Sequence, residues 1–169
     1  METEKTALDE DSALRVVEEC YADVLAYCRR HAKSREEAEE ITQEAFLRFV
    51  ANQPREGALK KPTAYLITIA RNLCIDAARR KGVMTFVPIS EAAEPETSDD
   101  YPSEMQSVLE ALDDREREAI ELRYDQGLGI GDIATIMGVS RFAVNRLIKK
   151  ALAQLRREIT SGNDERQHR

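Results

Sequence analysis

Side chains suited to nucleic-acid recognition gather in SRFAVNRLIKKALAQLRRE, residues 140–158, which holds six basic residues and one acid. Arginine and asparagine donate paired hydrogen bonds to base edges, and lysine and arginine bind phosphates. At helical spacing Arg141, Asn145 and Arg146 lie near the start of this segment, where we predict contacts with bases. The cations predicted to contact phosphates are Lys149, Lys150, Arg156 and Arg157.

A basic helical face can also be a solvated face, because amphipathic helices with charged outer sides are common. The preceding residues, IGDIATIMGVS, favour DNA binding. Gly138 predicts a tight turn after a short apolar helix, Val139 packs between two helices, and Ser140 caps the second helix. This pattern is typical of a helix-turn-helix, whose second helix enters the major groove. Phe142 falls on the same basic side, within reach of a thymine methyl group or a sugar.

A second polar face occurs in YLITIARNLCIDAARRKG, residues 65–82. On a helix the apolar residues of this segment form a broad core side, which includes Tyr65, Leu66 and Ala70. The opposite side collects Thr68, Arg71, Asn72, Ile75, Asp76 and Arg79. Arginine and asparagine there are suited to bases and phosphates, but a solvated face is an equal alternative.

A leucine among acids marks the segment after the capping box Ser34-Arg35-Glu36-Glu37. On a helix Leu47 lies on the side of Glu36, Glu40, Gln43 and Glu44, away from the apolar side that contains Phe46 and Phe49. Single exposed apolar residues are normal on protein surfaces. A leucine rimmed by acids is also typical of a protein contact. Helical geometry alone leaves both interpretations open.

Groups for catalysis or metal binding are sparse. The sequence has two histidines, His31 and His168, and no glycine-rich phosphate-binding loop. Cys28 and His31 have a spacing that can chelate a metal ion, but Cys20 would lie about 12 Å from Cys28 along a helix. We therefore interpret the three cysteines, which include Cys74, as core thiols, and predict neither a metal, nor a cofactor, nor an enzyme.

Helical periodicity dominates the elements that must position these residues. It predicts helices over residues 14–32, 35–51, 62–81, 104–112, 114–125, 130–137 and 140–159, and no strand. The first helix has a predicted core stripe of Leu14, Val17, Tyr21, Val24, Leu25, Cys28 and Ala32. The predicted fold class is all-α.

The predicted domains are residues 10–82 and 103–160, joined by a flexible acidic linker. Residues 83–102 hold three prolines, five acids and no base, as expected for such a linker. The net charge is −7, but basic residues concentrate in both predicted domains, so the total does not exclude nucleic acid. The first residues, METEKTALDEDSA, show no signal peptide, and no apolar run predicts membrane insertion. We expect a cytoplasmic protein with reduced cysteines.

Three stretches in order resemble the RNA polymerase sigma factors of the sigma-70 family, in particular the extracytoplasmic-function (ECF) group, which keeps only regions 2 and 4. They are AEEITQEAFLRF (38–49), AYLITIARNLCIDAARR (64–80) and LDDREREAIELRYDQGLGIGDIATIMGVSRFAVNRLIKKALAQLR (112–156). The resemblance covers about residues 10–159. It implies a protein that binds core RNA polymerase, recognises the −10 and −35 promoter elements and promotes DNA melting.

The resemblance also implies roles for residues. Docking on the clamp helices of the polymerase β′ subunit is implied for Glu40, Gln43, Glu44 and Leu47. The loop before the third helix holds a base flipped from the −10 element, and the implied −10 contacts are Asn52, Arg55, Lys60, Lys61, Arg71, Asn72, Ile75 and Arg79. The implied −35 contacts are Arg141, Phe142, Asn145, Arg146, Lys149 and Lys150. The β flap and an anti-sigma factor are further implied partners.

Some positions depart from the family. Tyr65 stands where Trp is usual, and Phe142-Ala143 stand where a Gly-Thr pair is usual. The Phe142-Ala143 pair is expected to change which −35 sequence is recognised, but not how the helix binds DNA. GLGIGDIA is richer in glycine than usual, and its Asp132 replaces the commoner Glu. Two alternatives remain: a stand-alone DNA-binding regulator, and a protein–protein adaptor that has lost promoter activity.

Overall fold

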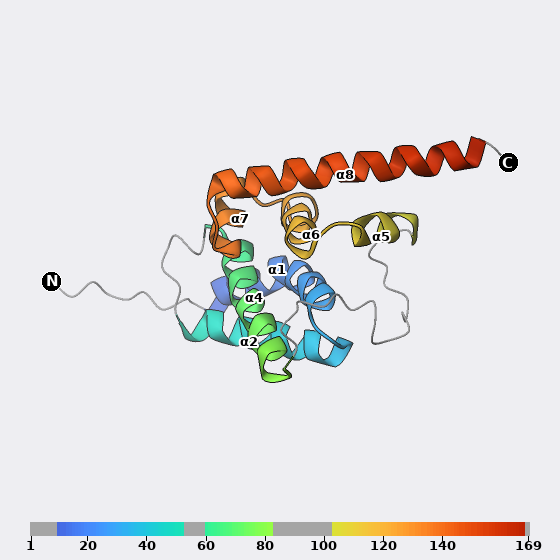
Figure 1. Cartoon of the computed structure of the whole chain (residues 1–169). Coiled ribbons are helices and arrows are strands. Elements are labelled where there is room, and N and C mark those ends of the chain that lie inside the picture. The colour runs from blue at the N-terminus through green and yellow to red at the C-terminus, as the bar shows by residue number, and fades with distance from the viewer. Residues whose placement is uncertain (1–9, 53–59, 83–102, 168–169) are drawn as a thin grey trace. The chain divides into compact units, whose positions relative to one another are not determined.

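The computed structural model describes residues 10–52, 60–82 and 103–167, and every regular element in these ranges is a helix (Figure 1). The chain divides into two compact units, residues 1–94 and 95–169. The predicted all-α fold with two helical domains is confirmed for the described ranges. The predicted linker, residues 83–102, lies outside them. None of the described helices is both long enough and apolar enough to cross a membrane.

Three helices form the first unit in the part of the chain that the structure describes. They are α1 (Glu10–His31), α2 (Arg35–Ala51) and α4 (Pro62–Arg80), and each packs against the other two (Figure 1). The side chains of Phe49, Leu66 and Ile67 are completely buried between them. The rings of Phe49 and Tyr65 meet edge to face, with centroids 5.7 Å apart, which joins α2 to the start of α4. Each large apolar side chain buried in this way stabilises the unit by about 1.5–3 kcal/mol.

The buried side of α1 differs from the predicted stripe. Leu14 is 56% exposed and Tyr21 is 38% exposed. Val16 and Tyr27 are buried instead. The prediction for Leu14 and Tyr21 is wrong because α1 packs on both α2 and α4, and the directions of these two helices determine which side is covered. Tyr21 stacks on the Phe46 ring, with centroids 5.8 Å apart, and so keeps one face in solvent.

The start of α2 is tied to the end of α4 through Glu37. Ser34 caps α2 by accepting a hydrogen bond of 3.1 Å from the Glu37 N–H, as predicted. The Glu37 carboxylate accepts hydrogen bonds of 2.7 Å from the Lys33 N–H and from the Lys81 ammonium. Burial raises the pKa of Glu37, but the bonds from Lys81 and Lys33 outweigh burial and leave the pKa below its ordinary value of 4.5.

Replacing this carboxylate is expected to change how stability depends on pH. Because the pKa of Glu37 is lowered by folding, its contribution to stability is complete above pH 4.5 and is lost as the pH falls through the folded-state pKa. Wild type is therefore expected to melt at a higher temperature than Glu37→Gln at pH 7, with a smaller difference at pH 3. Thermal unfolding followed by circular dichroism checks this, and a constant difference across this range would contradict it.

Within residues 103–167, four α-helices form the second unit: α5 (Ser103–Glu110), α6 (Asp114–Ile120), α7 (Ile130–Met137) and α8 (Arg141–Gln167). α5, α6 and α7 lie along one side of the long α8 (Figure 1). The predicted helix 114–125 changes to a π-helical turn, η2 (Glu121–Asp125), where the Gln126 N–H bonds the carbonyl of Glu121. α8 also continues past the predicted end at residue 159.

The turn between α7 and α8 has the predicted helix-turn-helix geometry. Gly138 is left-handed, with φ 66° and ψ 37°, a conformation that costs glycine little and residues with a Cβ more. The Val139 N–H bonds the carbonyl of Ala134 and closes the turn. Ser140 caps α8 by accepting a hydrogen bond of 3.1 Å from the Ala143 N–H. These bonds orient the first turn of α8 relative to α7.

Candidate nucleic-acid and polymerase interfaces

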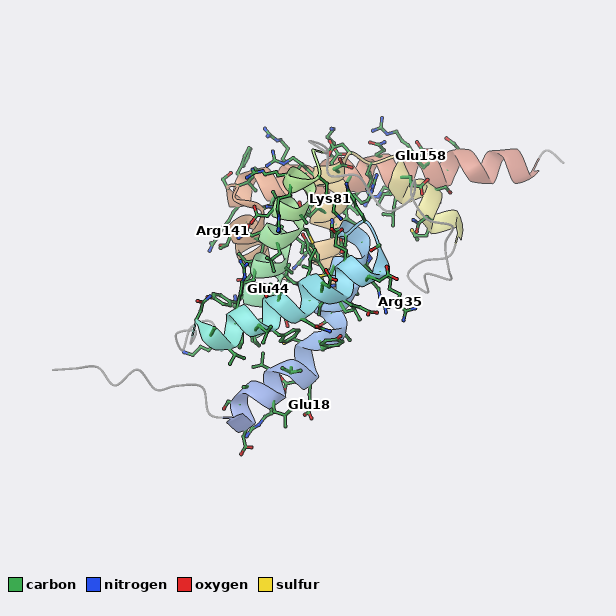
Figure 2. The ribbon with its side chains drawn as sticks, turned by 90° about the horizontal axis from the view of Figure 1, so that it is seen from below. Glu18, Arg35, Glu44, Lys81, Arg141 and Glu158 are labelled. Atoms are coloured by element: carbon green, nitrogen blue, oxygen red, sulfur yellow. The ribbon has the colours of Figure 1, made fainter. Side chains whose placement is uncertain are left out.

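The outer side of α8 presents the residues predicted to contact the −35 element. All six are exposed to solvent near its start: Arg141, Phe142, Asn145, Arg146, Lys149 and Lys150. The opposite side buries Val144, Ile148 and Ala151 against the rest of the unit. Figure 2 shows Arg141 at the start of α8 and Glu158 farther along it. Because these polar residues lie on the solvent side of one helix, a single major groove can contact them together.

A glycine in α7 makes room for Arg141. A Cβ built on Gly131 would lie 3.1 Å from Nη2 and 3.3 Å from Nε of Arg141. Glycine inside a helix is less favourable than alanine by up to about 1 kcal/mol. The missing side chain lets the guanidinium of Arg141 lie against the first turn of α7. This role of Gly131 was not predicted from the sequence. The unusually high glycine content of GLGIGDIA was the feature that could have indicated it.

Lys150 differs from its neighbours on α8, because its ammonium is engaged within the unit. It pairs with the carboxylate of Glu116, which is 1% exposed, and lies 3.6 Å from Oδ2 of Asp113. The hydrogen bond with Glu116 raises the pKa of Lys150 above its ordinary 10.5. Asp113 also caps α6 through a 2.9 Å bond from the Glu116 N–H. The Lys150 side chain is nevertheless 64% exposed, so its contact with the −35 element stays a prediction. Moving its charge to DNA would leave the buried Glu116 carboxylate unpaired, which would weaken such a contact.

Removing the Lys150 ammonium is therefore expected to destabilise the second unit. In Lys150→Met the Glu116 carboxylate stays buried without its cation, and we expect the melting temperature to fall by about 5 °C. Lys149→Met is the matched control, because Lys149 is exposed on the outer side of α8. Thermal unfolding of both variants checks the assignment. Equal melting temperatures for the two variants would show that the Lys150–Glu116 pair contributes nothing measurable.

The side of α4 that faces away from the core carries the residues predicted to contact the −10 element. Asn72 and Arg79 are exposed, and Arg71 and Ile75 are half-buried. The core side of α4 buries Leu66, Ile67, Ala70, Leu73 and Cys74, of which Ile67 was not predicted. In the preceding loop, Asn52 ends α2 and is exposed, as are Lys60 and Lys61. Arg55 lies outside the described residues.

The exposed side of α2 carries the predicted polymerase contacts. Leu47 is 65% exposed, and Glu40 and Gln43 are exposed near it on the helix. Glu44, labelled on α2 in Figure 2, accepts a 2.7 Å hydrogen bond from Nε of Arg48. The apolar residues Ile41, Ala45, Phe46 and Phe49 face the core instead. Leu47 is therefore an apolar side chain held in water on a polar helical surface.

All three cysteines lie in the buried part of the first unit. Cys20, Cys28 and Cys74 are buried thiols outside any disulfide, so their prediction as core thiols is confirmed. Burial raises the pKa of Cys20. This effect is larger than the lowering caused by the 3.3 Å contact between the Cys20 sulfur and the Thr63 hydroxyl. A raised pKa disfavours the reactive thiolate. Within the described ranges no group of three or more His, Cys, Asp or Glu residues is placed to hold a metal ion.

The two units correspond to two known sequence families. The model of sigma-70 region 2 matches residues 16–83, and the model of sigma-70 region 4 matches residues 108–157. The chain therefore belongs to the sigma-70 family of RNA polymerase sigma factors, in its ECF group. It is 28% identical to the ferric citrate uptake sigma factor FecI of Escherichia coli K12, over 75% of this chain and 79% of FecI. It is 28% identical to the ECF sigma factor SigD of Mycobacterium tuberculosis H37Rv, over 95% of this chain and 83% of SigD.

Solved structures share the fold. The sigma factor RpoE of Bartonella quintana, in complex with the anti-sigma factor NepR, matches with a TM-score of 0.69 at 21% identity, over 87% of this chain and 96% of RpoE. CnrH, in complex with the cytosolic domain of CnrY, matches with a TM-score of 0.63 at 19% identity, over 94% of each chain. Members of the sigma-70 family are transcription initiation factors and not enzymes. The comparisons do not favour the stand-alone regulator.

Proposed function

We propose that the two units of this sigma factor divide promoter recognition between them. The unit of α1, α2 and α4 docks on core polymerase and opens the −10 element, and the unit of α5 to α8 reads the −35 element. The proposed domains are residues 10–82 and 103–160, with 83–102 as the connecting linker. The observation that carries the proposal is the solvent side of α8, where Arg141, Asn145 and Arg146 project from a capped helix-turn-helix.

In the −35 complex, α8 lies in the major groove with its first turns toward the bases. Asn145 and Arg146 donate hydrogen bonds to base edges, and Lys149 neutralises phosphate farther along the helix. Arg141, held against Gly131, contacts the DNA from beside the turn. Phe142 belongs to the same surface. Lys150 is a further proposed contact, and it also fixes α8 to α6 through Glu116. The β flap of polymerase is the proposed partner that holds this unit at the −35 element.

In the −10 complex, the outward side of α4 lies along the DNA. Asn72 and Arg79 are exposed for contacts with bases and phosphates, and Arg71 and Ile75 are partly accessible. The loop from Asn52 to Lys61 is assigned the base flipped from the non-template strand, and Arg55, Lys60 and Lys61 are proposed as further −10 contacts. Flipping exposes the edge and face of the base, which suits a protein that must also melt the duplex.

Polymerase docking is assigned to the exposed side of α2. Leu47 inserts into an apolar site on the β′ clamp helices, and Glu40, Gln43 and Glu44 surround it. A buried apolar centre with a polar rim is the usual anatomy of a protein–protein contact. The exposure of Leu47 supports this role, because a core residue at that position would be unavailable to a partner.

An anti-sigma factor is a further proposed partner, and the cytoplasm is the proposed location. The structures of RpoE and CnrH, which share this fold, were each determined in complex with a partner, and the partner of RpoE is an anti-sigma factor. A protein that seats on both units would prevent docking and DNA binding together.

Transcription in vitro tests the proposed function. The purified chain is mixed with core polymerase and a pool of genomic promoter fragments, and transcript start sites are mapped. We expect specific starts that share −10 and −35 elements and depend on the chain. Gel-shift measurements on the same fragments distinguish a sigma factor from a stand-alone regulator, because a stand-alone regulator binds duplex DNA specifically without polymerase. Tight specific binding by the chain alone, with no transcription in the presence of polymerase, would overturn the proposal.

A further inference from the structure

Phe142 is the most exposed large apolar side chain in the described part of the chain, at 77% of its surface. It occupies the first turn of α8, whose geometry is fixed by the Ser140 cap and the Gly138 turn. Its ring therefore projects into solvent from a well-defined backbone. A phenylalanine in this position contributes little to the core of its own unit, which is built from the opposite side of α8.

The neighbours of Phe142 define its surroundings. Asn145 and Arg146 lie three and four residues later, so they are adjacent to Phe142 on the helical surface, and both are exposed. The helix thus presents an aromatic ring beside two hydrogen-bonding side chains suited to base edges. Phosphates are bound by cations and hydrogen-bond donors, so an apolar aromatic ring among these side chains indicates a contact with a base or sugar rather than with phosphate alone.

We propose that Phe142 recognises the C5-methyl group of a thymine in the −35 element. This inference rests on the proposed function of α8 and specifies one base contact within it. The thymine methyl is the apolar group that a base edge presents in the major groove, and phenylalanine is among the side chains that contact it. Asn145 and Arg146 then read neighbouring bases, whose hydrogen-bonding edges suit an amide and a guanidinium. Sugars line the walls of the groove, whereas the first turn of a recognition helix is directed at its floor.

Replacing thymine by uracil tests the proposal, because uracil pairs identically and lacks only the methyl group. A promoter used by the holoenzyme is prepared with each −35 thymine changed singly to deoxyuridine. Affinity of the holoenzyme for each template is measured by competition, and transcription is measured on the same templates. Wild type is expected to bind one deoxyuridine template about fourfold more weakly, from the transfer energy of one methyl-sized group. Phe142→Ala is expected to bind the thymine and deoxyuridine templates equally.

Two variants complete the experiment. Phe142→Leu keeps an apolar side chain and should retain part of the discrimination, whereas Ile159→Ala removes another exposed apolar side chain of α8 and should retain all of it. If Phe142→Ala weakens binding equally on all templates, the ring contacts a sugar or a protein instead, and the inference is overturned. It is also overturned if wild type is insensitive to every substitution. Start-site-specific transcription by wild type on the thymine template tests the proposed function separately.

Discussion

Leu47→Asp is expected to abolish binding of this chain to core RNA polymerase while leaving the first unit folded. Leu47 is 65% exposed on α2, so the substitution removes little from the core. In the proposed complex, however, the new carboxylate would be buried in an apolar site and surrounded by Glu40 and Glu44. Central apolar residues of interfaces are where truncation or charge has the largest effect. We expect a loss in affinity of at least about 100-fold, which corresponds to about 2.7 kcal/mol.

Fluorescence anisotropy of a labelled chain titrated with core polymerase measures this loss. Leu14→Asp is the matched control, because Leu14 is 56% exposed in the same unit but lies on α1. Circular dichroism and thermal unfolding establish that both variants keep their helices. Normal binding by Leu47→Asp would refute the docking assignment. Equal losses of affinity in both variants would show that the interface includes α1 as well as α2.

Charge reversal at Arg146 and Lys149 is expected to eliminate transcription from promoters that need a −35 element, without loss of polymerase binding. Both side chains are exposed on the outer side of α8, and neither forms part of the core of the second unit. Glutamate at these positions removes favourable contacts and places negative charge beside phosphates. Since one good contact to a base edge contributes about 1–3 kcal/mol, the double variant should lose at least about 100-fold in promoter-dependent transcription.

Run-off transcription and polymerase binding are measured in parallel for this variant. Arg115→Glu provides a control for charge reversal outside α8, because Arg115 is exposed at the start of α6 in the same unit. It should transcribe normally. Loss of polymerase binding in the double variant would show that the two functions are not divided between the units as proposed. Full transcription would show that α8 does not read the promoter.

Local sequence patterns predicted the elements that carry the candidate sites. Ser34, Gly138 and Ser140 predicted helix caps and a turn that the structure reproduces, because these depend on neighbouring backbone atoms only. The polar outer sides of α4 and α8 also follow from helical periodicity, which places residues three and four apart on one face. The roles of individual side chains at the promoter and on polymerase remain predictions.

Contacts between distant segments could not be predicted in this way. Periodicity placed Leu14 and Tyr21 in the core of α1, but the packing of α1 on two helices exposes both. The pairing of Lys150 with Glu116 and the space that Gly131 leaves for Arg141 join residues on different helices. No rule based on spacing within one helix contains that information.

Local patterns in the sequence are enough to predict where the helices form, which sides of them are polar, and that two basic surfaces occur in one acidic chain. Which cations are paired with a buried carboxylate of their own unit became clear from the packing of the helices. The physical reason is that helix propensity, capping and periodicity are local, whereas the burial of a carboxylate such as Glu116 depends on elements that meet only after folding. Lys149 and Lys150 are adjacent and chemically identical, yet only Lys150 is paired with that buried carboxylate.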